Sequence, residues 1–415
     1  MIIFHIDVNS AYLSWQAVYE LENGSKRDLR QLPAIIGGDQ AKRHGIVLAK
    51  SIPAKKYGVI TGESLLEARM KCPDLLVIPP NYQLFAQCSQ AMYEILLEYS
   101  PKVQRYSVDE CFLDYTESIS LYGDPLEAAH TIRRRIKNEL GFTVNIGISS
   151  NKLLAKMGSE LKKPDRVHTL FPREMEEKMW PLPVGELFMV GRATRKKLKR
   201  LNIHTIGQLA KSDPDFLRLH FKSYGTLLWQ YANGIDDSLV KESNFPAQKG
   251  VGNSTTIPFD VTDRKEALLV LLSLAEKVAI RMRRKKAYGQ VVAISIKSFQ
   301  LERISHQRRL PHPTQSTRAI YSIVEELFDE AWTGVPIRHL GVRVTDLTDQ
   351  PFDQLSLFEP FDRDRDAKLD ETMDQIRKRF GEKILVRGCF PHSGIRPIQG
   401  GVAENDEYPI MTSLL

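Results

Sequence analysis

The N-terminal third of the chain alternates between short apolar runs and longer stretches in which apolar residues recur at helical spacing. Residues 2–6 form a continuous run of β-forming residues, typical of a buried strand, and residues 10–20 then change to a helical stripe. The same reasoning predicts helices at 63–71, 82–99 and 124–139, and strands at 102–106, 111–115 and 142–148. This order predicts a βαββαβ, ferredoxin-like unit with an insertion after its first strand.

Three acidic residues fall at the ends of these strands. Asp7 ends the first strand, and Asp109 and Glu110 lie in the turn of the hairpin. Because the first strand of such a unit lies beside the hairpin, we expect the three side chains to meet at one edge of the sheet. A polar turn or a strand terminator is the simpler explanation for any single acid. That explanation weakens here because all three acids fall at the same edge.

The periodicity changes beyond residue 167, where prolines interrupt it. A turn at Gly191 then precedes a basic helix that carries Arg192 and Arg195. Backbone amides at the start of such a helix bind phosphate, as in a helix-hairpin-helix that grips the DNA backbone. A pair of antiparallel helices whose cations face water explains the same pattern equally well.

A second α/β segment follows a polar, glycine-containing linker at 233–253. Its pattern predicts helices at 263–285 and 315–332 and strands at 289–297 and 338–346. The segment contains a cluster of cations that suits a face tracking DNA phosphates, including Arg283, Arg284, Lys285 and Lys297. A solvated helix end that complements the helix dipole is the open alternative.

Length and charge agree with a multidomain protein that binds a polyanion. At 415 residues the chain exceeds what one hydrophobic core usually organises, which predicts about two to four domains. Residues 1–350 carry 49 Lys and Arg against 39 Asp and Glu, an excess that suits nucleic acid or serves solubility alone. The four cysteines lack zinc-site spacing and suit a reducing cytoplasm. No apolar run of about 18 residues occurs, so no membrane role is expected.

Three blocks of the sequence resemble the signature of the Y-family, or translesion, DNA polymerases. They are residues 6–12 (IDVNSAY), 107–114 (SVDECFLD), and 147–156 (GISSNKLLAK) running on to Lys163-Pro164, and the middle block is the most specific. The resemblance implies a multidomain α/β polymerase shaped like a right hand. Its domains would be a palm at 1–11 and 79–166, fingers at 12–78, a thumb at 167–240, a little finger at 245–348 and a tail at 349–415.

The resemblance also implies the chemistry of the site. Two Mg²⁺ ions would bind Asp7, Asp109 and Glu110, and the backbone carbonyl of Val8 looks like a further ligand. Mg²⁺ is a hard cation that takes oxygen ligands, and two such ions activate a primer 3′ hydroxyl and neutralise the leaving pyrophosphate. The expected substrates are primer-template DNA and deoxynucleoside triphosphates.

Four further residues match nucleotide-binding positions of the family. Tyr12 matches the steric gate that excludes a ribose 2′ hydroxyl, although periodicity alone makes it a core aromatic in the same helical stripe. Lys163 matches the lysine that contacts the triphosphate. Ser51 lies in the nucleotide-binding block, and Lys55 stands where the family usually has arginine. The family commonly has tyrosine at the position of Ile52, so details of nucleotide binding differ from the usual pattern.

The C-terminal segment carries one short motif. Gln354, Leu355, Ser356, Leu357 and Phe358 resemble the peptide by which bacterial polymerases dock on the sliding clamp, an extended segment with a polar anchor and two apolar plugs. An amphipathic stretch follows at 366–380, and the sequence assigns it no role. We expect the protein to be a monomer.

Together these observations predict a template-directed DNA polymerase of low fidelity that lacks proofreading and bypasses DNA damage. Two alternatives remain. A nucleotidyl cyclase has a related palm and two metals but needs no thumb, and it would form cyclic nucleotide without template. A non-catalytic, clamp-tethered DNA scaffold would bind DNA without Mg²⁺-dependent extension.

Overall fold

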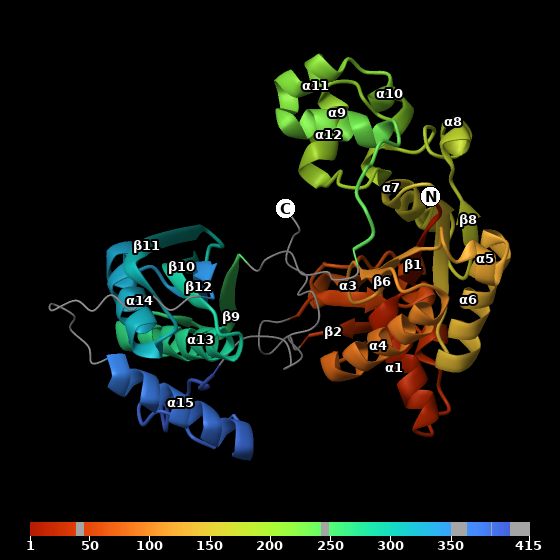
Figure 1. Ribbon diagram of the computed structural model, residues 1–415. Coiled ribbons are helices and arrows are strands. Elements are labelled where there is room, and N and C mark those ends of the chain that lie inside the picture. The colour runs from red at the N-terminus through yellow and green to blue at the C-terminus, as the bar shows by residue number, and fades with distance from the viewer. Residues whose placement is uncertain (39–44, 242–248, 350–362, 383, 399–415) are drawn as a thin grey trace. The chain divides into compact units, whose positions relative to one another are not determined.

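The computed structural model describes residues 1–38, 45–241, 249–349, 363–382 and 384–398. The chain divides into two compact units, one comprising residues 1–38 and 46–241 and the other the described residues from 249 onward. Figure 1 shows both units. Within the described residues, no helix is long and apolar enough to span a bilayer.

The centre of the first unit is a five-stranded sheet. Its strands, in the spatial order β5-β6-β1-β7-β8, are β5 (Val103–Arg105), β6 (Glu110–Asp114), β1 (Ile3–Val8), β7 (Val144–Ser149) and β8 (Val167–Thr169). Every residue of β1 and β7 is buried, including the polar residues His5, Asp7 and Asn145. Strand β1 pairs antiparallel with both β6 and β7, so the predicted central position of the first strand is confirmed.

The two faces of this sheet carry different residues. Phe4, Ile6 and Val8 join a large core with the helices α1 (Ala11–Glu22), α4 (Tyr82–Tyr99) and α6 (Pro125–Leu140). Because side chains alternate along a strand, His5 and Asp7 face the opposite side. There β1 and β7 contact helix α7 (Lys152–Glu160).

Helix α7 lies unusually close to the sheet because of one glycine. A Cβ atom on Gly147 would lie 2.0 Å from the carbonyl oxygen of Ala155 and 2.4 Å from the backbone nitrogen of Ser159. No other residue fits without moving the helix. Gly147 pairs with His5 across the strands, so this close approach brings the inner face of α7 over the polar side of β1.

The insertion after β1 forms a small sheet of its own. Strands β3 (Val47–Lys50), β2 (Ala34–Gly37) and β4 (Leu76–Ile78) lie in that order, accompanied by α2 (Ile52–Lys56) and α3 (Leu65–Lys71). Its core contains Ile35, Val47 and Leu65. The sequence pattern predicted only the helix at 63–71. The strands of three or four residues are too short to give a periodic signal.

The regular elements of residues 172–232 are short helices joined by turns. The main helices are α8 (Met175–Lys178), α9 (Arg192–Arg200), α10 (Ile206–Ala210), α11 (Pro214–Phe221) and α12 (Ser223–Ala232). They share a core that includes Leu198, Leu217 and Leu228. Met189, just before α9, has φ +75°, a backbone conformation that favours glycine.

The second unit is an antiparallel sheet with helices packed against one face. Its strands β11 (Arg303–Thr314), β10 (Tyr288–Ser298), β12 (Ile337–Thr348) and β9 (Gly250–Val261) lie in that order, and α13 (Arg264–Arg284) and α14 (Thr317–Ala331) pack against it. Both predicted helices are confirmed. The sequence pattern missed β11, whose first half is exposed and polar, and placed the start of β9 in a linker.

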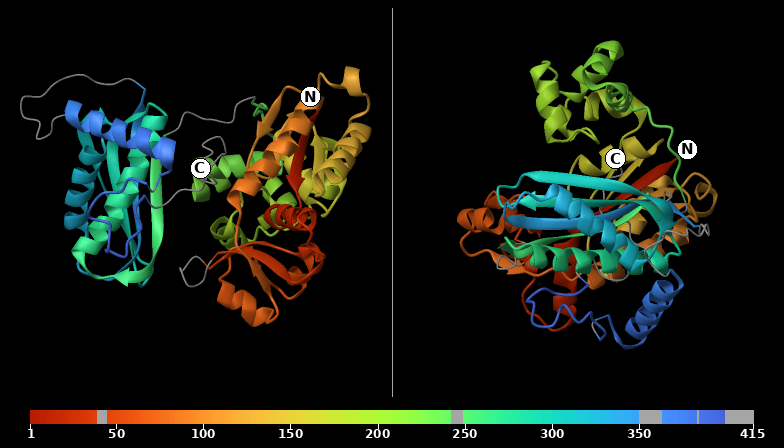
Figure 2. Two further views of the ribbon diagram at one scale, coloured as in Figure 1. Left: turned by 90° about the horizontal axis from the view of Figure 1, so that it is seen from below. Right: turned by 90° about the vertical axis from the view of Figure 1, so that its left-hand side faces the viewer.

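Helix α15 (Arg363–Phe380) lies on the side of α13 and α14 away from the sheet (Figures 1 and 2). It covers the amphipathic stretch at 366–380, and its buried face carries charged residues as well as Met373. Asp370 and Arg377 are buried, whereas Leu369 and Phe380 are exposed. Charge pairing explains why these two polar residues can be buried, because each meets an oppositely charged residue of α13: Arg283 opposite Asp370 and Glu276 opposite Arg377.

Candidate metal and nucleotide site

The predicted convergence of acids takes place at the junction of β1 and β6. Asp7 lies directly opposite Glu110 in the strand register, and the backbone N–H of Val8 donates to the carbonyl of Asp109 at 3.0 Å. About a hundred residues of sequence separation therefore collapse to adjacent strand positions. A separation of Asp7 from the two hairpin acids would have removed the basis of the metal-site hypothesis.

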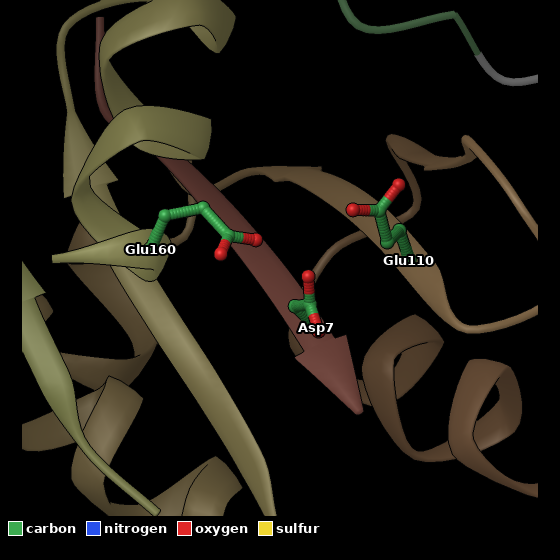
Figure 3. Close-up of side chains that lie close together, drawn as sticks. All are labelled: Asp7, Glu110 and Glu160. Carbon is green, nitrogen blue, oxygen red and sulfur yellow. The ribbon is translucent and has the colours of Figure 1, made fainter. Parts of the chain in front are cut away.

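A third carboxylate joins the cluster from helix α7. One carboxylate oxygen each from Asp7, Glu110 and Glu160 lies within 4.8 Å of the other two. Figure 3 shows Glu160 reaching from α7 toward Asp7, with Glu110 on the adjacent strand. Oxygen donors alone suit a hard divalent cation, so this donor set fits Mg²⁺. Glu160 was not among the predicted acids, because the resemblance in the block from 147 to Lys163 rests on its lysines.

Asp109 lies beside this cluster and is not one of its three members. Its Oδ1 accepts a hydrogen bond from the Ser107 hydroxyl at 2.6 Å. The same hydroxyl lies 3.4 Å from Oε2 of Glu110. Ser107 thus holds the two consecutive acids of the hairpin turn in a defined arrangement.

Two lysines balance the negative charge. The ammonium of Lys163 lies 3.1 Å from Oδ2 of Asp7 and 2.8 Å from Oε1 of Glu160, and Lys156 pairs with Glu110. Each lysine therefore holds a carboxylate that a divalent cation would use. The predicted contact of Lys163 with a triphosphate stays a prediction.

Burial shapes the acid-base behaviour of the site. Burial raises the pKa of Asp7 from 3.8 to about 8, although the Lys163 ammonium acts in the opposite direction; nearby Glu110, Glu160 and Asp109 raise it further. Burial also raises the pKa of Asp109, opposed by the Ser107 hydrogen bond. Asp7 therefore favours its protonated form near neutral pH, and a bound divalent cation must displace that proton.

His5 lies underneath the carboxylates, two residues before Asp7 on the same face of β1. It is fully buried, and its Nδ1 lies 2.8 Å from the hydroxyl of Ser159 on α7. Its Nε2 lies 3.8 Å from Oε1 of Glu110 and has no hydrogen-bond partner. Burial and the nearby lysines Lys156 and Lys163 hold the pKa of His5 well below its usual value.

Tyr12 lies in the first turn of α1, half-buried beside the site. Its ring stacks on Phe85 with centroids 4.6 Å apart and meets Trp15 edge-on at 5.9 Å. Burial raises the pKa of its hydroxyl to about 12, and the charge of Asp109 adds to this. The packing predicted from periodicity and the position predicted from the resemblance are thus compatible.

The hydroxyl of Ser51 is fully used in hydrogen bonds within the insertion, and a nucleotide contact by this residue stays a prediction. Its hydroxyl donates to the carbonyl of Leu32 at 2.7 Å and accepts from the N–H groups of Ala34 and Ala54, each at 3.1 Å. One donor and two acceptor sites exhaust the capacity of a hydroxyl. Ser51 therefore caps α2, whose next turn carries the exposed Lys55.

The predicted phosphate-binding turn before α9 is exposed. Gly191 is the N-cap residue of α9, and no side chain caps that helix start. Arg192 and Arg195 are exposed, and among the described residues no acid pairs with a cation of α9. The amides and the cations of this helix start are therefore available to a phosphate.

Two of the four cations predicted to contact DNA in the second unit form ion pairs with acids of the same unit. Arg283 forms ion pairs with Asp370 at 3.0 Å and Asp374 at 2.7 Å on α15, and Arg284 lies 3.2 Å from Glu382. Their guanidinium groups are paired with acids of the same unit, and DNA contact by Arg283 and Arg284 stays a prediction. The sequence could not reveal these pairings because the partners lie about ninety residues further along.

The other two predicted cations differ in their surroundings. Lys285 is exposed at the end of α13. Lys297 faces away from the helices, because Ile294 and Ile296 point into the core. It lies between Arg303 and His339 on the neighbouring strands, and this outer sheet face also carries Arg343. The clamp-motif residues 354–358 lie outside the described residues.

The chain is similar in sequence to one family of proteins along most of its length. Residues 6–160 match the model of the impB/mucB/samB family, and residues 248–357 match its C-terminal domain. DNA polymerase IV of Clostridium acetobutylicum is 46% identical over 94% of this chain and 98% of its own length. DNA polymerase IV of Acetivibrio thermocellus is 40% identical over 94% of this chain and 97% of its own length.

The fold is similar to solved structures of the same kind. A chimera of the Y-family DNA polymerases Dbh and Dpo4 superposes with a TM-score of 0.72, at 20% identity, over 84% of this chain and all of that one. DinB from Sulfolobus solfataricus superposes with a TM-score of 0.55, at 21% identity, over 83% of this chain and 98% of that one. These matches confirm the predicted multidomain α/β fold. They support neither a nucleotidyl cyclase nor a non-catalytic scaffold.

Proposed function

The chain belongs to the impB/mucB/samB family of Y-family DNA polymerases, and from this membership we infer that it copies a DNA template by adding deoxynucleotides to a primer. It is a DNA-directed DNA polymerase of the translesion type. The observation that carries this function is the pairing of Asp7 with Glu110 across β1 and β6, with Asp109 next to them. That arrangement places carboxylates from two distant blocks at one point.

Two Mg²⁺ ions are the proposed cofactor. Asp7, Asp109 and Glu110 would hold them, together with the carbonyl of Val8. When bound, the ions supply activation of the primer 3′ hydroxyl and charge neutralisation at the leaving pyrophosphate. The protein supplies position: β1 and β6 fix Asp7 and Glu110, and the Ser107 hydroxyl orients Asp109.

Lys163 is the proposed contact of the incoming triphosphate. In the structure it is held between Asp7 and Glu160. A cation bound to Asp7 would replace Lys163 as the partner of that carboxylate. The Lys163 ammonium would then contact only Glu160 and could turn toward an anionic phosphate. Lys55, exposed on α2, is a second proposed nucleotide contact. It provides charge without the planar fork of arginine.

The domains are proposed from the family pattern. The five-stranded sheet corresponds to the palm, the small sheet to the fingers, residues 167–240 to the thumb and the second unit to the little finger. We propose that DNA phosphates contact Gly191, Arg192 and Arg195 at the start of α9. In the second unit we propose that DNA phosphates contact Lys285 and, on the outer sheet face, Lys297. On the outer sheet face Lys297 lies beside Arg303, and such a gathering of cations suits backbone tracking.

Primer extension by matched variants tests this function. Asp109→Asn should lower the extension rate on the order of a thousandfold, since it removes charge at the point where the reaction develops charge. Asp114→Asn is the control, because it removes the same charge at the other end of β6. An Asp109→Asn protein with unchanged extension, or both variants equally impaired, would refute the assignment. Cyclic nucleotide formed without template would revive the cyclase.

Sugar selection tests the proposed gate. Tyr12→Ala should admit ribonucleotides, because the ring stacked on Phe85 no longer blocks a 2′ hydroxyl. Tyr12→Phe keeps the ring and should keep the discrimination. Measured incorporation ratios of ribonucleotide to deoxyribonucleotide that do not differ between the two variants would remove Tyr12 from this role.

Residues 354–358 are the proposed sliding-clamp motif, and the protein is proposed to act as a monomer in the cytoplasm. Replacing Leu357 and Phe358 by alanine should abolish clamp binding and leave extension without clamp unchanged. Sedimentation of the purified chain measures the oligomeric state. The described cysteines are all free thiols, in agreement with a reducing compartment.

A further inference from the structure

His5 is a buried polar residue at the site to which the proposed mechanism assigns no role. Its ring is fully buried between β6 and α7, tilted against Phe112 at 4.7 Å between centroids. It contributes no ligand to the carboxylate cluster. A buried polar side chain costs free energy unless its polar atoms have partners.

The hydrogen bonds around Ser159 define which ring nitrogen carries the proton. The Ser159 hydroxyl donates its only hydrogen to the backbone carbonyl of Lys156 at 2.8 Å. Its oxygen therefore acts as an acceptor toward Nδ1 of His5, 2.8 Å away. Nδ1 must then carry the hydrogen, and in a neutral ring Nε2 is left as a bare acceptor.

That acceptor faces another acceptor. Nε2 of His5 lies 3.8 Å from Oε1 of Glu110 and has no hydrogen-bond partner. This separation is too long for a direct hydrogen bond, and two lone pairs do not attract each other. Oε1 of Glu110 already accepts from the Lys156 ammonium, so Nε2 is the atom without a partner, and a donor held between the two atoms would satisfy it. Because Mg²⁺ usually keeps several of its waters, a cation bound at Asp7 and Glu110 brings such a donor with it.

We propose that His5 is a positioning residue of the metal site, whose Nε2 accepts a hydrogen bond from a water molecule that the bound cation holds beside Glu110. The role rests on the proposed function. Ser159 fixes the ring, and the close approach of α7 at Gly147 fixes Ser159. Residues that hydrogen-bond to the ligands of a metal orient those ligands, and their removal typically lowers metal affinity about 10-fold to 100-fold.

The tautomer is the first test. Nitrogen NMR of metal-free protein labelled at histidine should show His5 with the hydrogen on Nδ1. The Ser159→Ala variant removes the acceptor and should shift the ring toward the other tautomer. A ring in the unaltered protein that carries its hydrogen on Nε2 would overturn the proposal, because Nε2 would then be a donor facing Glu110.

Metal affinity is the second test, measured with Mn²⁺ by electron paramagnetic resonance on the full chain without DNA. In His5→Gln the side-chain oxygen reaches the position of Nε2, whereas in His5→Asn it reaches only that of Nδ1. His5→Asn should therefore lose Mn²⁺ affinity about tenfold or more, and His5→Gln should stay within about threefold of the unaltered protein. Equal affinities of the two variants would overturn the proposal.

Two controls separate the possible failures. A purely structural role would lower the melting temperature of both variants without changing the Mn²⁺ affinity of the folded protein, which also overturns the proposal. Asp7→Asn must remove Mn²⁺ binding at the site. If it does not, the proposed metal site itself fails, independently of His5.

Discussion

Neutralising Asp7 should stabilise the metal-free protein while it destroys the polymerase. Asp7 is buried among Glu110, Glu160 and Asp109, and its pKa is raised from 3.8 to about 8. Between these two values the folded protein keeps a proton that the unfolded chain has lost. The stability of the metal-free protein therefore falls as pH rises through this window, and Asp7→Asn should abolish that loss.

The magnitude follows from the pKa shift. One pKa unit corresponds to about 1.4 kcal/mol, so at pH 7 the unfolded chain gains about 4 kcal/mol from releasing the proton that the folded state retains. Loss of the Lys163 contact at 3.1 Å offsets part of this gain. Water entry at the partly open site reduces it further, which leaves a stabilisation of about 2 kcal/mol.

Urea unfolding with a metal chelator measures this effect. The stabilisation by Asp7→Asn should be small at about pH 5 and largest at about pH 8. Excess Mg²⁺ should stabilise the unaltered protein and leave the variant unchanged, because only the former binds the ion. A variant that is less stable than the unaltered chain near pH 8, or a gain that does not depend on pH, would refute the reasoning.

Three further changes test the packing. Met189→Gly should raise stability by about 0.5 kcal/mol because it relieves the φ of +75°, whereas Met189→Ala keeps that backbone strain and should not; thermal melts compare them. Arg377→Leu should cost about 2 kcal/mol in urea unfolding, because buried Glu276 then keeps Arg387 as its one counter-ion of the two; adding Glu276→Leu should restore much of the loss, and no recovery would contradict the pairing. Gly147→Ala should displace α7 and weaken Mn²⁺ binding. Gly388→Ala is the control and should leave Mn²⁺ binding unchanged, because a Cβ atom at Gly388 meets no other atom within 4 Å.

The order of elements around the central sheet was predictable from local pattern. Strands β1 and β7 are buried on both faces, and the β-forming residues that they contain mark them in the sequence. The turn after β5 places Asp109 and Glu110 where a hairpin must bring them beside the first strand. The acidic core of the site was therefore predictable from the positions of elements alone.

Some contacts of the site depend on tertiary packing, which the pattern of apolar and polar residues along the chain does not predict. Glu160 joins the carboxylates, and Ser159 reaches His5, only because α7 approaches the sheet at Gly147. Ser51 looked available for a nucleotide, yet its hydroxyl is used three times within the insertion. Hydrogen bonds between distant residues follow from the fold, and spacing along the chain does not encode them.

Charge is the property that local pattern described least well. Arg283 and Arg284 are a basic cluster in the sequence, and acids of the C-terminal segment neutralise both. By itself the sequence determined the strands β1, β5, β6 and β7 of the central sheet, and hence that Asp7 meets the acidic turn, because backbone pairing follows side-chain periodicity. Only the tertiary structure decided which charges remain available to a ligand, because an ion pair requires proximity in space.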